Sequence, residues 1–319
     1  MNIYHNISDF KKINNAIVTI GTFDGIHYGH QQIIRTVVEK AKMLQGESVI
    51  LTFFPHPRMI IDPENSALKM INTIQEKAER LESLGVDHLI ITPFTRDFSN
   101  LEADSYIQQI LVETIGIKHL IIGYDHRFGK DRKGGLEELK QGGQKYGFDV
   151  TEIPEQDIND VAVSSTKIRT ALLQGDVKLA AEYLGYNFSI KGIVIKGDKI
   201  GRTIGFPTAN LFVEETYKLI PADGIYAVSL IIQEEDQTHS SEVYTGMAYI
   251  GQRPTINGMT RNIEVNIFDF NKEVYGQTIT MKFHEFLRAD YKFSSLETMT
   301  DQLKVDKLNT LNYFEKHPI

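Results

Sequence analysis

The sequence contains no cysteine, and this absence excludes several kinds of chemistry. Without thiols the chain forms no disulfide bond, zinc–thiolate site or iron–sulfur cluster, and it has no cysteine nucleophile. The chain also lacks an excess of basic residues, because 34 Lys and Arg stand against 42 Asp and Glu, a formal net charge of −8. Broad nucleic-acid binding needs a basic face, so we do not expect it. Small phosphorylated ligands need only a local positive site.

A long apolar run is missing as well. The most apolar stretch, residues 225–232, is interrupted by Ser229 and is far shorter than the roughly 20 residues that span a bilayer. The N-terminal residues, MNIYHNISDFKKINN, have no apolar core of the kind that signal peptides carry. We therefore expect a cytoplasmic protein that does not associate with membranes.

The first half of the chain alternates short apolar runs with segments of helical spacing. Runs such as AIVTI and HLIIT are typical of buried parallel strands, and Gly46 is the expected end of the first long helix. Two short helices, ending at Gly175 and Gly185, close this half. Strand and helix repeated in this order predict a doubly wound α/β sheet. The expected strands lie at 16–20, 48–53, 88–92 and 119–123, and the expected helices at 33–44, 75–84, 103–114 and 135–146.

After about residue 185 the pattern changes to strands separated by Gly, Asn and Asp, which is typical of a compact antiparallel barrel. The chain then ends in one helix, for which Ser294 and Glu297 have the spacing of a capping box. We expect two domains, residues 1–185 and 186–319, with no internal repeat and no low-complexity linker. The expected strands are 188–195, 224–232, 242–250, 262–270 and 278–283, and the apolar stripe of the helix is Leu296, Met299, Leu303 and Leu311.

The segment GTFDGIHYGH (21–30) joins the first expected strand to the first helix. Ligands of open α/β sheets bind at the carboxyl ends of strands, where a helix N-terminus favours phosphate. The three glycines let the backbone approach a ligand closely, and His27 and His30 are spaced to face one side as the helix begins. Imidazoles there could stabilise charge that grows in a transition state. The plain alternative is a glycine-rich turn without a ligand.

This segment resembles the HxGH signature of the nucleotidylyltransferase superfamily, which transfers a nucleotidyl group and releases pyrophosphate. Three further segments resemble those of bacterial FAD synthetases: TFFPHPR (52–58), GYDHRFG (123–129) and VSSTKIR (163–169). In the second of these His126 stands where Phe is usual, and Ala162, just before the third, stands where some relatives have Arg. The resemblance implies a Rossmann-like domain in which His27 and His30 stabilise the α-phosphate of ATP. The implied ATP and FMN contacts are Gly21, Phe23, Asp24, Gly25, Gly29, His56, Asp125, Arg127, Ser165, Thr166 and Arg169.

The chemistry of these residues supports the implied contacts, but it also allows structural roles that involve no ligand. His56 lies between two prolines, on what we expect to be a stiff, exposed turn. Arg127 belongs to a basic cluster with Lys130, Arg132 and Lys133, which is otherwise a solvated loop. Hydroxyls, backbone N–H groups and a guanidinium at 165–169 could grip phosphates at a helix start. Simple N-capping is the alternative there.

The stretch GDKIGRTIGFPTAN (197–210) predicts a second phosphate site. Its glycines and proline force a turning loop whose backbone can wrap a phosphate. Thr208 and Asn210 offer neutral oxygens, which suit a Mg²⁺ ion already carried by ATP phosphates.

This stretch resembles the GRxxGFPTAN motif of riboflavin kinases nearly word for word, with Lys196 in place of a common His. The segments at 221–226, 246–255, 263–266 and 287–293 continue the resemblance, with Asn266 for His and Asp290 for Glu. It implies that Glu264 is the catalytic carboxylate, accepting the proton of the flavin 5′-hydroxyl as it attacks the γ-phosphate of ATP. The implied ATP and flavin contacts are Gly197, Gly201, Arg202, Gly205, Phe206, Pro207 and Arg288, with Thr208 and Asn210 for Mg²⁺.

The whole chain thus resembles a bifunctional riboflavin kinase/FAD synthetase. The barrel would convert riboflavin and ATP to FMN, and the first domain would join FMN to ATP, giving FAD and pyrophosphate. Small-molecule substrates are the expected partners, and the sequence leaves open whether the chain forms a homo-oligomer. Two alternatives stay open: a nucleotidylyltransferase for another acceptor whose barrel senses flavin, and a flavin-binding regulator without turnover.

Overall fold

The computed structural model of the chain describes residues 1–62, 68–155, 157–158, 161–197, 200–233, 242–256 and 259–319. It divides into two compact units, Met1–Ser165 and Thr166–Ile319. The boundary between functional domains that we expect at residue 185 differs from this division of the structure, and it stays a prediction. In the described part of the chain, no helix has the length and apolarity needed to cross a membrane.

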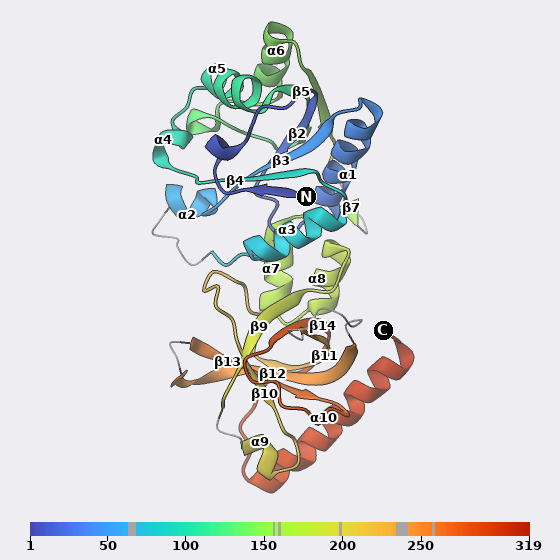
Figure 1. The fold of residues 1–319 in the computed structure, drawn as a ribbon. Helices are drawn as coiled ribbons and strands as arrows, with labels where there is room; N and C mark the ends of the chain where they lie inside the picture. The colour runs from blue at the N-terminus through green and yellow to red at the C-terminus, as the bar shows by residue number, and fades with distance from the viewer. Residues whose placement is uncertain (63–67, 156, 159–160, 198–199, 234–241, 257–258) are drawn as a thin grey trace. The chain divides into compact units, whose positions relative to one another are not determined.

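The first unit is built on a six-stranded parallel sheet of order β1-β4-β3-β2-β5-β6 (Figure 1). The four strands expected from the sequence are confirmed. The edge strands β1 and β6 are partly exposed, so they carry no continuous apolar run and were not predicted. The strands are β1 Asn2–Tyr4, β2 Ala16–Ile20, β3 Glu47–Phe53, β4 His88–Thr92, β5 Ile117–Gly123 and β6 Asp149–Ile153.

Helices cover both faces of this sheet, as the doubly wound prediction requires. One buried cluster joins Val18 and Leu51 to Leu111 and Leu139, and the other joins Ile17 and the opposite strand face to α1 and α3. Alternate strand residues supply the two clusters, because successive side chains of a strand point to opposite faces. The helices are α1 Tyr28–Met43, α2 Pro57–Ile61, α3 Ile74–Ser83, α4 Arg96–Ser99, α5 Ala103–Tyr106, the π-helical η3 Ile107–Ile115, and α6 Leu136–Tyr146.

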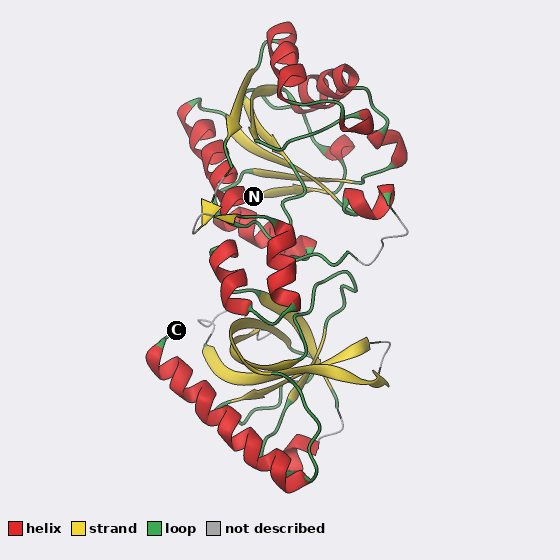
Figure 2. Cartoon of the chain, turned by 180° about the vertical axis from the view of Figure 1, so that it is seen from behind, coloured by secondary structure: helices red, strands yellow, loops and turns green. Residues whose placement is uncertain are grey.

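The second unit is a closed antiparallel barrel of six strands, in the order β10-β13-β12-β11-β14-β9. The helix α10 packs along β11, β12 and β14, and runs as one long helix to the C-terminal end (Figure 2). The short strand β10 was not predicted. The elements are α7 Ser165–Leu173, whose first residue belongs to the first unit, α8 Val177–Leu184, β9 Ser189–Ile195, α9 Ile200–Thr203, β10 Ala209–Phe212, β11 Gly224–Gln233, β12 Val243–Ile256, β13 Met259–Ile267, β14 Thr278–Arg288 and α10 Leu296–Lys316.

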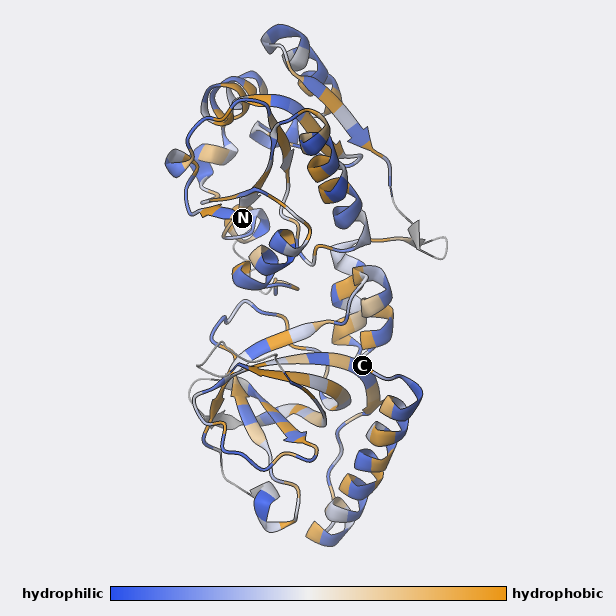
Figure 3. Ribbon diagram, turned by 45° about the vertical axis from the view of Figure 1, so that its right-hand side comes forward, coloured by the Kyte–Doolittle hydropathy of each residue, from blue (hydrophilic) through white to orange (hydrophobic). Residues whose placement is uncertain are grey.

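The start of α10 corrects the sequence prediction by one residue. The N-cap is Ser295, whose backbone is extended and whose hydroxyl accepts a hydrogen bond from the N–H of Thr298 at 3.2 Å. Thr298 Oγ1 in turn accepts from the N–H of Ser295, so Ser294 and Glu297 form no capping box. The apolar stripe is also only half right. Leu303 packs on the barrel, whereas Leu296 is 56% exposed and Leu311 is 41% exposed, and apolar and polar residues alternate along α10 (Figure 3).

Candidate active sites

The loop between β2 and α1 carries the first candidate site, and its backbone is unusually bent. Phe23 and Ile26 have positive φ angles of 44° and 37°, and Gly25 has a φ of 87°. Only glycine adopts such angles without strain, so the two other residues must be held in place by their surroundings. A side chain at Gly21 would meet the Phe23 ring at 3.1 Å, which explains the glycine there.

Hydrogen bonds from three parts of the first unit hold this loop. The buried carboxylate of Asp24 accepts from the N–H groups of Ile71 and Asn72, at 2.9 and 3.4 Å. Ser165 Oγ donates to the Asp24 carbonyl at 2.8 Å, and Gln31 Nε2 donates to the carbonyl of Ile26 at 2.9 Å. Asp24 and Ser165, both expected to contact ATP, therefore also fix the loop.

His27 and His30 lie together where α1 begins. Their rings are stacked, with centroids 3.6 Å apart, and His27 is the N-cap of α1. His27 Nδ1 accepts a hydrogen bond from the backbone N–H of His30 at 3.4 Å, so the neutral ring carries its hydrogen on Nε2. Burial lowers the pKa of His27 to about 4, and burial, with smaller effects of the neighbouring His27 and Lys77, lowers the pKa of His30 well below its usual value. Both rings are therefore neutral at pH 7, and each can offer one N–H donor.

His56 follows β3 and caps α2 in the same way. Its Nδ1 accepts from the N–H of Arg58 at 3.1 Å, which again leaves the ring hydrogen on Nε2. The side chain is buried, so the prediction of an exposed turn was wrong. Capping turns the ring toward its own helix, and the flanking prolines do not prevent this.

The remaining predicted contacts of this site lie on other segments of the chain. Asp125 and Arg127 are exposed in the loop after β5, the strand next to β2. Because the loops after parallel neighbours β3, β2 and β5 meet at one sheet edge, His56, Asp125 and the loop 21–30 share that edge. Two lysines of the predicted basic cluster have acidic partners, Lys130 with Glu102 and Lys133 with Asp131. Thr166, exposed, and Arg169, half-buried, lie on α7 in the second unit.

An aromatic cluster at the same edge was missed by the sequence reasoning. Phe53, Phe94, Phe98, Tyr106 and Phe128 contact one another in sequence, with ring centroids 5.2–5.8 Å apart. In the described part of the unit, three buried polar atoms near this cluster, besides His30 Nδ1 of the loop 21–30, have no hydrogen-bond partner. They are Thr92 Oγ1, Tyr106 Oη and His126 Nε2. The aromatic residues come from one strand, two loops and two helices, so no local pattern reveals them.

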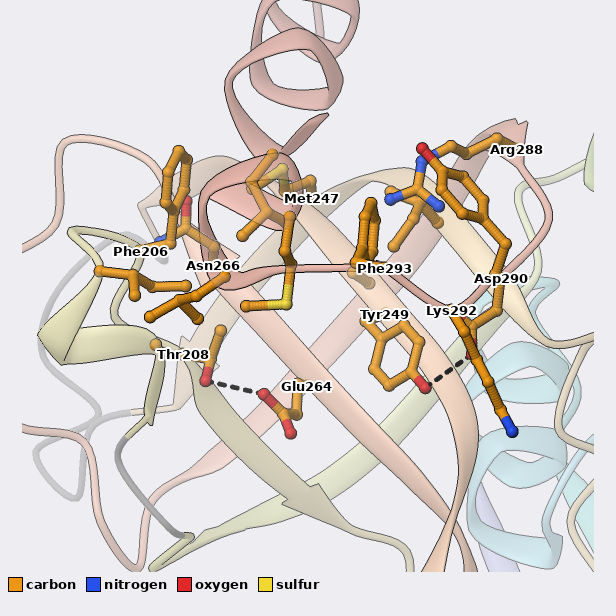
Figure 4. Close-up of a pocket in the computed structure, with 18 of the residues that line it drawn as sticks. Phe206, Thr208, Met247, Tyr249, Glu264, Asn266, Arg288, Asp290, Lys292 and Phe293 are labelled. Atoms are coloured by element: carbon orange, nitrogen blue, oxygen red, sulfur yellow. Dashed lines mark hydrogen bonds between the residues drawn. The ribbon is translucent and has the colours of Figure 1, made fainter. Parts of the chain in front are cut away.

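The second candidate site is a cavity of about 670 Å³ between the barrel strands and α10 (Figure 4). Its walls are largely apolar, from residues such as Phe206, Met247 and Leu303. Polar groups lie at both ends: Thr208 and Glu264 point toward one another at one end, and Arg288, Asp290 and Lys292 lie at the other (Figure 4). Large apolar cavities with a few placed polar groups are typical of ligand sites. The polar lining residues are Thr208, Asn210, Glu264, Asn266, Arg288, Asp290, Lys292 and Ser295.

Glu264 is held by donors on both of its carboxylate oxygens. Thr208 Oγ1 donates to Oε2 at 2.9 Å, and Asn262 Nδ2 donates to Oε1 at 2.5 Å. Asn210 of β10 is paired directly with Glu264 of β13, so the two side chains stand on one barrel face. Asn266 donates from Nδ2 to the Pro207 carbonyl at 2.7 Å, which fixes the loop before Thr208. Asn262 was not among the residues predicted from the sequence.

The oxygens of Thr208, Asn210 and Glu264 fit a Mg²⁺ ion. Mg²⁺ prefers hard oxygen ligands and usually takes only one or two from the protein, with the rest from water and substrate phosphates. Among the described residues, no three His, Asp or Glu side chains gather closely enough to hold a metal alone. The hydroxyl, amide and carboxylate oxygens on one wall of the cavity are the kind of set that Mg²⁺ requires.

The glycine loop before Thr208 approaches this group closely. A side chain on Gly197 would collide with the Asn210 amide, and Gly205 has a φ of 82°, so both positions require glycine. Gly201 and Phe206 line the cavity, whereas Arg202 and Pro207 are exposed. Asp198 and Lys199 of the predicted loop lie outside the described residues.

Arg288 lines the other end of the cavity and is fixed there by α10. Its Nε and Nη2 donate to both oxygens of the buried Asp306, at 2.7–3.1 Å. The guanidinium also lies 4.7 Å from the centroid of the Tyr291 ring. Nearby, Tyr249 Oη donates to Asp290 at 2.9 Å. Arg288 therefore has a structural partner in addition to its place at the cavity.

Comparisons with known proteins match the two parts of the chain to two families. The FAD synthetase family matches residues 9–167, and the riboflavin kinase family matches residues 184–314. Proteins described as bifunctional riboflavin kinase/FMN adenylyltransferase are similar over nearly the whole chain. That of Listeria monocytogenes is 36% identical, covering 95% of this chain and 93% of its own. That of Escherichia coli K12 is 33% identical, covering 97% and 96%.

A solved structure has the same fold. It is described as a macrolide-efflux protein from Streptococcus pneumoniae, and it matches 97% of this chain and 98% of its own, with a TM-score of 0.87 and 33% identity. Both family regions are present in this chain. The N-terminal region has FMN adenylyltransferase activity and the C-terminal region has riboflavin kinase activity, with ATP and flavins as substrates. The chain belongs to the bifunctional riboflavin kinase/FMN adenylyltransferase family.

Proposed function

We propose that the kinase reaction takes place in the cavity of the barrel, with Glu264 as the catalytic base. Its carboxylate accepts the proton of the riboflavin 5′-hydroxyl while that oxygen attacks the γ-phosphorus of ATP, giving FMN and ADP. The observation that carries this proposal is the pair of hydrogen bonds from Thr208 and Asn262, which orient the carboxylate inside the cavity. The apolar walls suit the ring system of a flavin.

Thr208 and Asn210 are the proposed protein ligands of Mg²⁺. When bound, Mg²⁺ neutralises the phosphate charge and orients the transferred group. Asn266 keeps the Pro207 carbonyl, and with it Thr208, in place. Gly197, Gly201, Gly205, Phe206, Pro207 and Arg202 belong to the loop that we propose wraps the ATP phosphates, and Arg288 is a proposed flavin or phosphate contact.

We further propose that adenylyl transfer takes place at the loop 21–30. An oxygen of the FMN phosphate attacks the α-phosphorus of ATP and pyrophosphate leaves, so no side-chain nucleophile is required. Binding, orientation and charge stabilisation then account for the rate. His27 and His30 donate hydrogen bonds to the phosphate as negative charge grows, a role supported by their neutral state and by the Nε2–H tautomer of His27.

The other predicted contacts of this site remain proposals. His56, Asp125, Arg127, Ser165, Thr166 and Arg169 bind ATP or FMN in this scheme, beside the loop residues Gly21, Phe23, Asp24, Gly25 and Gly29. Phe94 and Phe98 of the aromatic cluster are half-buried, and they offer apolar surface at the same edge to a flavin. A Mg²⁺ requirement of this second step, a cytoplasmic location and a homo-oligomer are proposed from the sequence alone.

Two substitutions test the assignment of the sites. His30→Ala should leave FMN formation unchanged and reduce FAD formation by about a hundredfold or more, because a donor to the developing charge is lost. Glu264→Ala should abolish FMN formation and leave FAD formation from supplied FMN unchanged. Chromatography of reactions with ATP and Mg²⁺, started from riboflavin or from FMN, resolves FMN, FAD, ADP and pyrophosphate. Loss of both activities in either folded variant would contradict the two-site assignment.

A further inference from the structure

Lys77 on α3 is a charged side chain in an unusual place. It is 1% exposed and is among the largest fully buried side chains of the described chain. A buried lysine is costly unless partners compensate its charge and hydrogen-bonding needs. It follows the capped start of α3 at Thr73, so the helix fixes its position. The sequence pattern gave this lysine no role.

The ammonium group of Lys77 contacts the candidate adenylyl-transfer loop directly. Its Nζ donates to the Thr22 carbonyl at 2.6 Å and lies 3.5 Å from Thr52 Oγ1, which also donates to that carbonyl. Thr22 precedes Phe23, the first residue of the loop with a positive φ. Lys77 therefore holds the loop at the point where its backbone becomes strained.

Charged and titratable groups surround this lysine from each element packed against it. Asp24 of the loop faces it and favours its charged form, whereas burial lowers its pKa to about 8. His30 on α1 is stacked on His27, and the positive charge of Lys77 contributes to the lowered pKa of His30. On α3 itself, Glu76 is directed to the backbone N–H of Thr73. At pH 7 the ammonium form prevails, so a fixed positive charge lies behind the loop.

Two consequences follow for a ligand at the loop. In a trans peptide the carbonyl and the following N–H point in opposite directions, so the bond from Lys77 to the Thr22 carbonyl directs the Phe23 N–H away from the lysine. A buried positive charge also attracts phosphate more strongly than an exposed one, because water does not screen it. Neither effect requires Lys77 to touch the substrate.

We propose that Lys77 is a positioning residue for adenylyl transfer, which sets the shape of loop 21–30 through Thr22 and supplies a buried positive charge to the phosphates of ATP. The inference rests on the proposed function, which places adenylyl transfer at this loop. The hydrogen bonds that support the inference are made by Lys77 of α3, which is not one of the site residues predicted from the sequence.

The test compares the full-length protein with Lys77→Arg, Lys77→Met and the control Lys42→Met, an exposed lysine of α1. The rate of FAD formation from FMN and ATP is measured as kcat/KM between pH 6 and 10. For the wild type we expect kcat/KM to fall above pH about 8, as Lys77 loses its proton. Lys77→Arg keeps its charge throughout and should be active without this fall.

Lys77→Met should lose about tenfold to a hundredfold of kcat/KM at pH 7, the range expected when a reacting group is misplaced. Lys42→Met should behave as the wild type. A purely structural lysine would not produce a pH-dependent fall that arginine removes. Near-ultraviolet circular dichroism checks whether each variant folds. If Lys77→Met does not fold, the inference is tested by comparing the pH profiles of kcat/KM of the wild type and Lys77→Arg.

Three results would overturn the inference: no fall near pH 8 in the wild type, the same fall in Lys77→Arg, or full activity in Lys77→Met. A parallel measurement on His30→Ala separates this failure from that of the proposed function. If His30→Ala keeps FAD formation, the placement of the reaction at the loop is wrong. If His30→Ala is inactive while Lys77→Met is fully active, only the role of Lys77 is wrong.

Discussion

Two histidines of the first unit act as helix N-caps, and this position determines which ring nitrogen carries hydrogen. In both His27 and His56 the Nδ1 atom accepts a backbone N–H, so the hydrogen remains on Nε2. The usual N-cap residues are serine, threonine, aspartate and asparagine. None of them has a second ring nitrogen that can donate a hydrogen bond to a ligand while the side chain caps the helix. A histidine cap thus combines the start of a helix with a donor of fixed direction.

This arrangement predicts how stability depends on pH. Because the pKa of His27 is lowered to about 4 in the folded state, the unfolded state binds the proton more readily between pH 6.5 and 4. The stability that the neutral ring contributes is therefore complete above pH 6.5 and is lost as the pH falls toward 4. From pH 6 to 5 this loss amounts to about 1 kcal/mol.

The variant His27→Asn tests this prediction, because asparagine caps the helix but does not titrate. Its free energy of unfolding, measured by urea denaturation, should fall less steeply than that of the wild type between pH 6 and 5. Between pH 7 and 7.5, where the histidine is neutral in both states, the two curves should run parallel. Equal slopes at acid pH would show that His27 is protonated equally in the folded and unfolded chain.

At the residue scale, the sequence predicted the residues that belong to motifs, but it did not predict the residues that hydrogen-bond to them and hold them in place. His27, His30, Thr208 and Glu264 lie in recognisable segments, and the structure brings Thr208 and Glu264 into direct contact. Lys77 and Asn262 have no local signal, because a lysine in an amphipathic helix and an asparagine in a strand are ordinarily exposed. Their burial and contacts depend on which segments meet in space.

At the scale of single elements, the start of α10 shows the limit of a sequence motif. Residues 294–298 read SSLET, so either serine has a suitable partner three residues later. The choice between them depends on the residue at which the backbone leaves the extended conformation, and this is Ser295. The hydrogen bond from Tyr249 to Asp290 holds the chain before the helix against the barrel, and a capping pattern does not contain such a contact.

The two serines provide a matched pair of substitutions. Ser295→Ala should lower the free energy of unfolding of the barrel unit by about 1 kcal/mol, because the Thr298 N–H loses its partner. Ser294→Ala, equally exposed and one residue away, should change it by less than about 0.5 kcal/mol. Thermal unfolding of the full-length protein gives both values. A larger effect at Ser294 would mean that the helix begins one residue earlier.

At the scale of the whole molecule, the order of the elements was the most predictable feature. Alternating strands and helices indicated the doubly wound sheet, and the change to strands after residue 185 indicated the barrel, because each pattern matches one way of covering a core. The exposed edge strands β1 and β6 and the short β10 were not predicted. They are held by their neighbours in the sheets, through pairings such as Ile3 with Leu89, and not by apolar patterns of their own.

The division of the chain into two units leads to a prediction about the intermediate. The histidine pair lies in the first unit and Glu264 in the second, so a chain defective in one reaction retains the residues proposed for the other. A mixture of His30→Ala and Glu264→Ala proteins, given riboflavin, ATP and Mg²⁺, should therefore form FAD by way of FMN released into solution. FAD should appear after a lag that shortens as protein concentration rises. If each variant keeps its single activity and the mixture still makes no FAD, FMN does not leave the chain on which it is made.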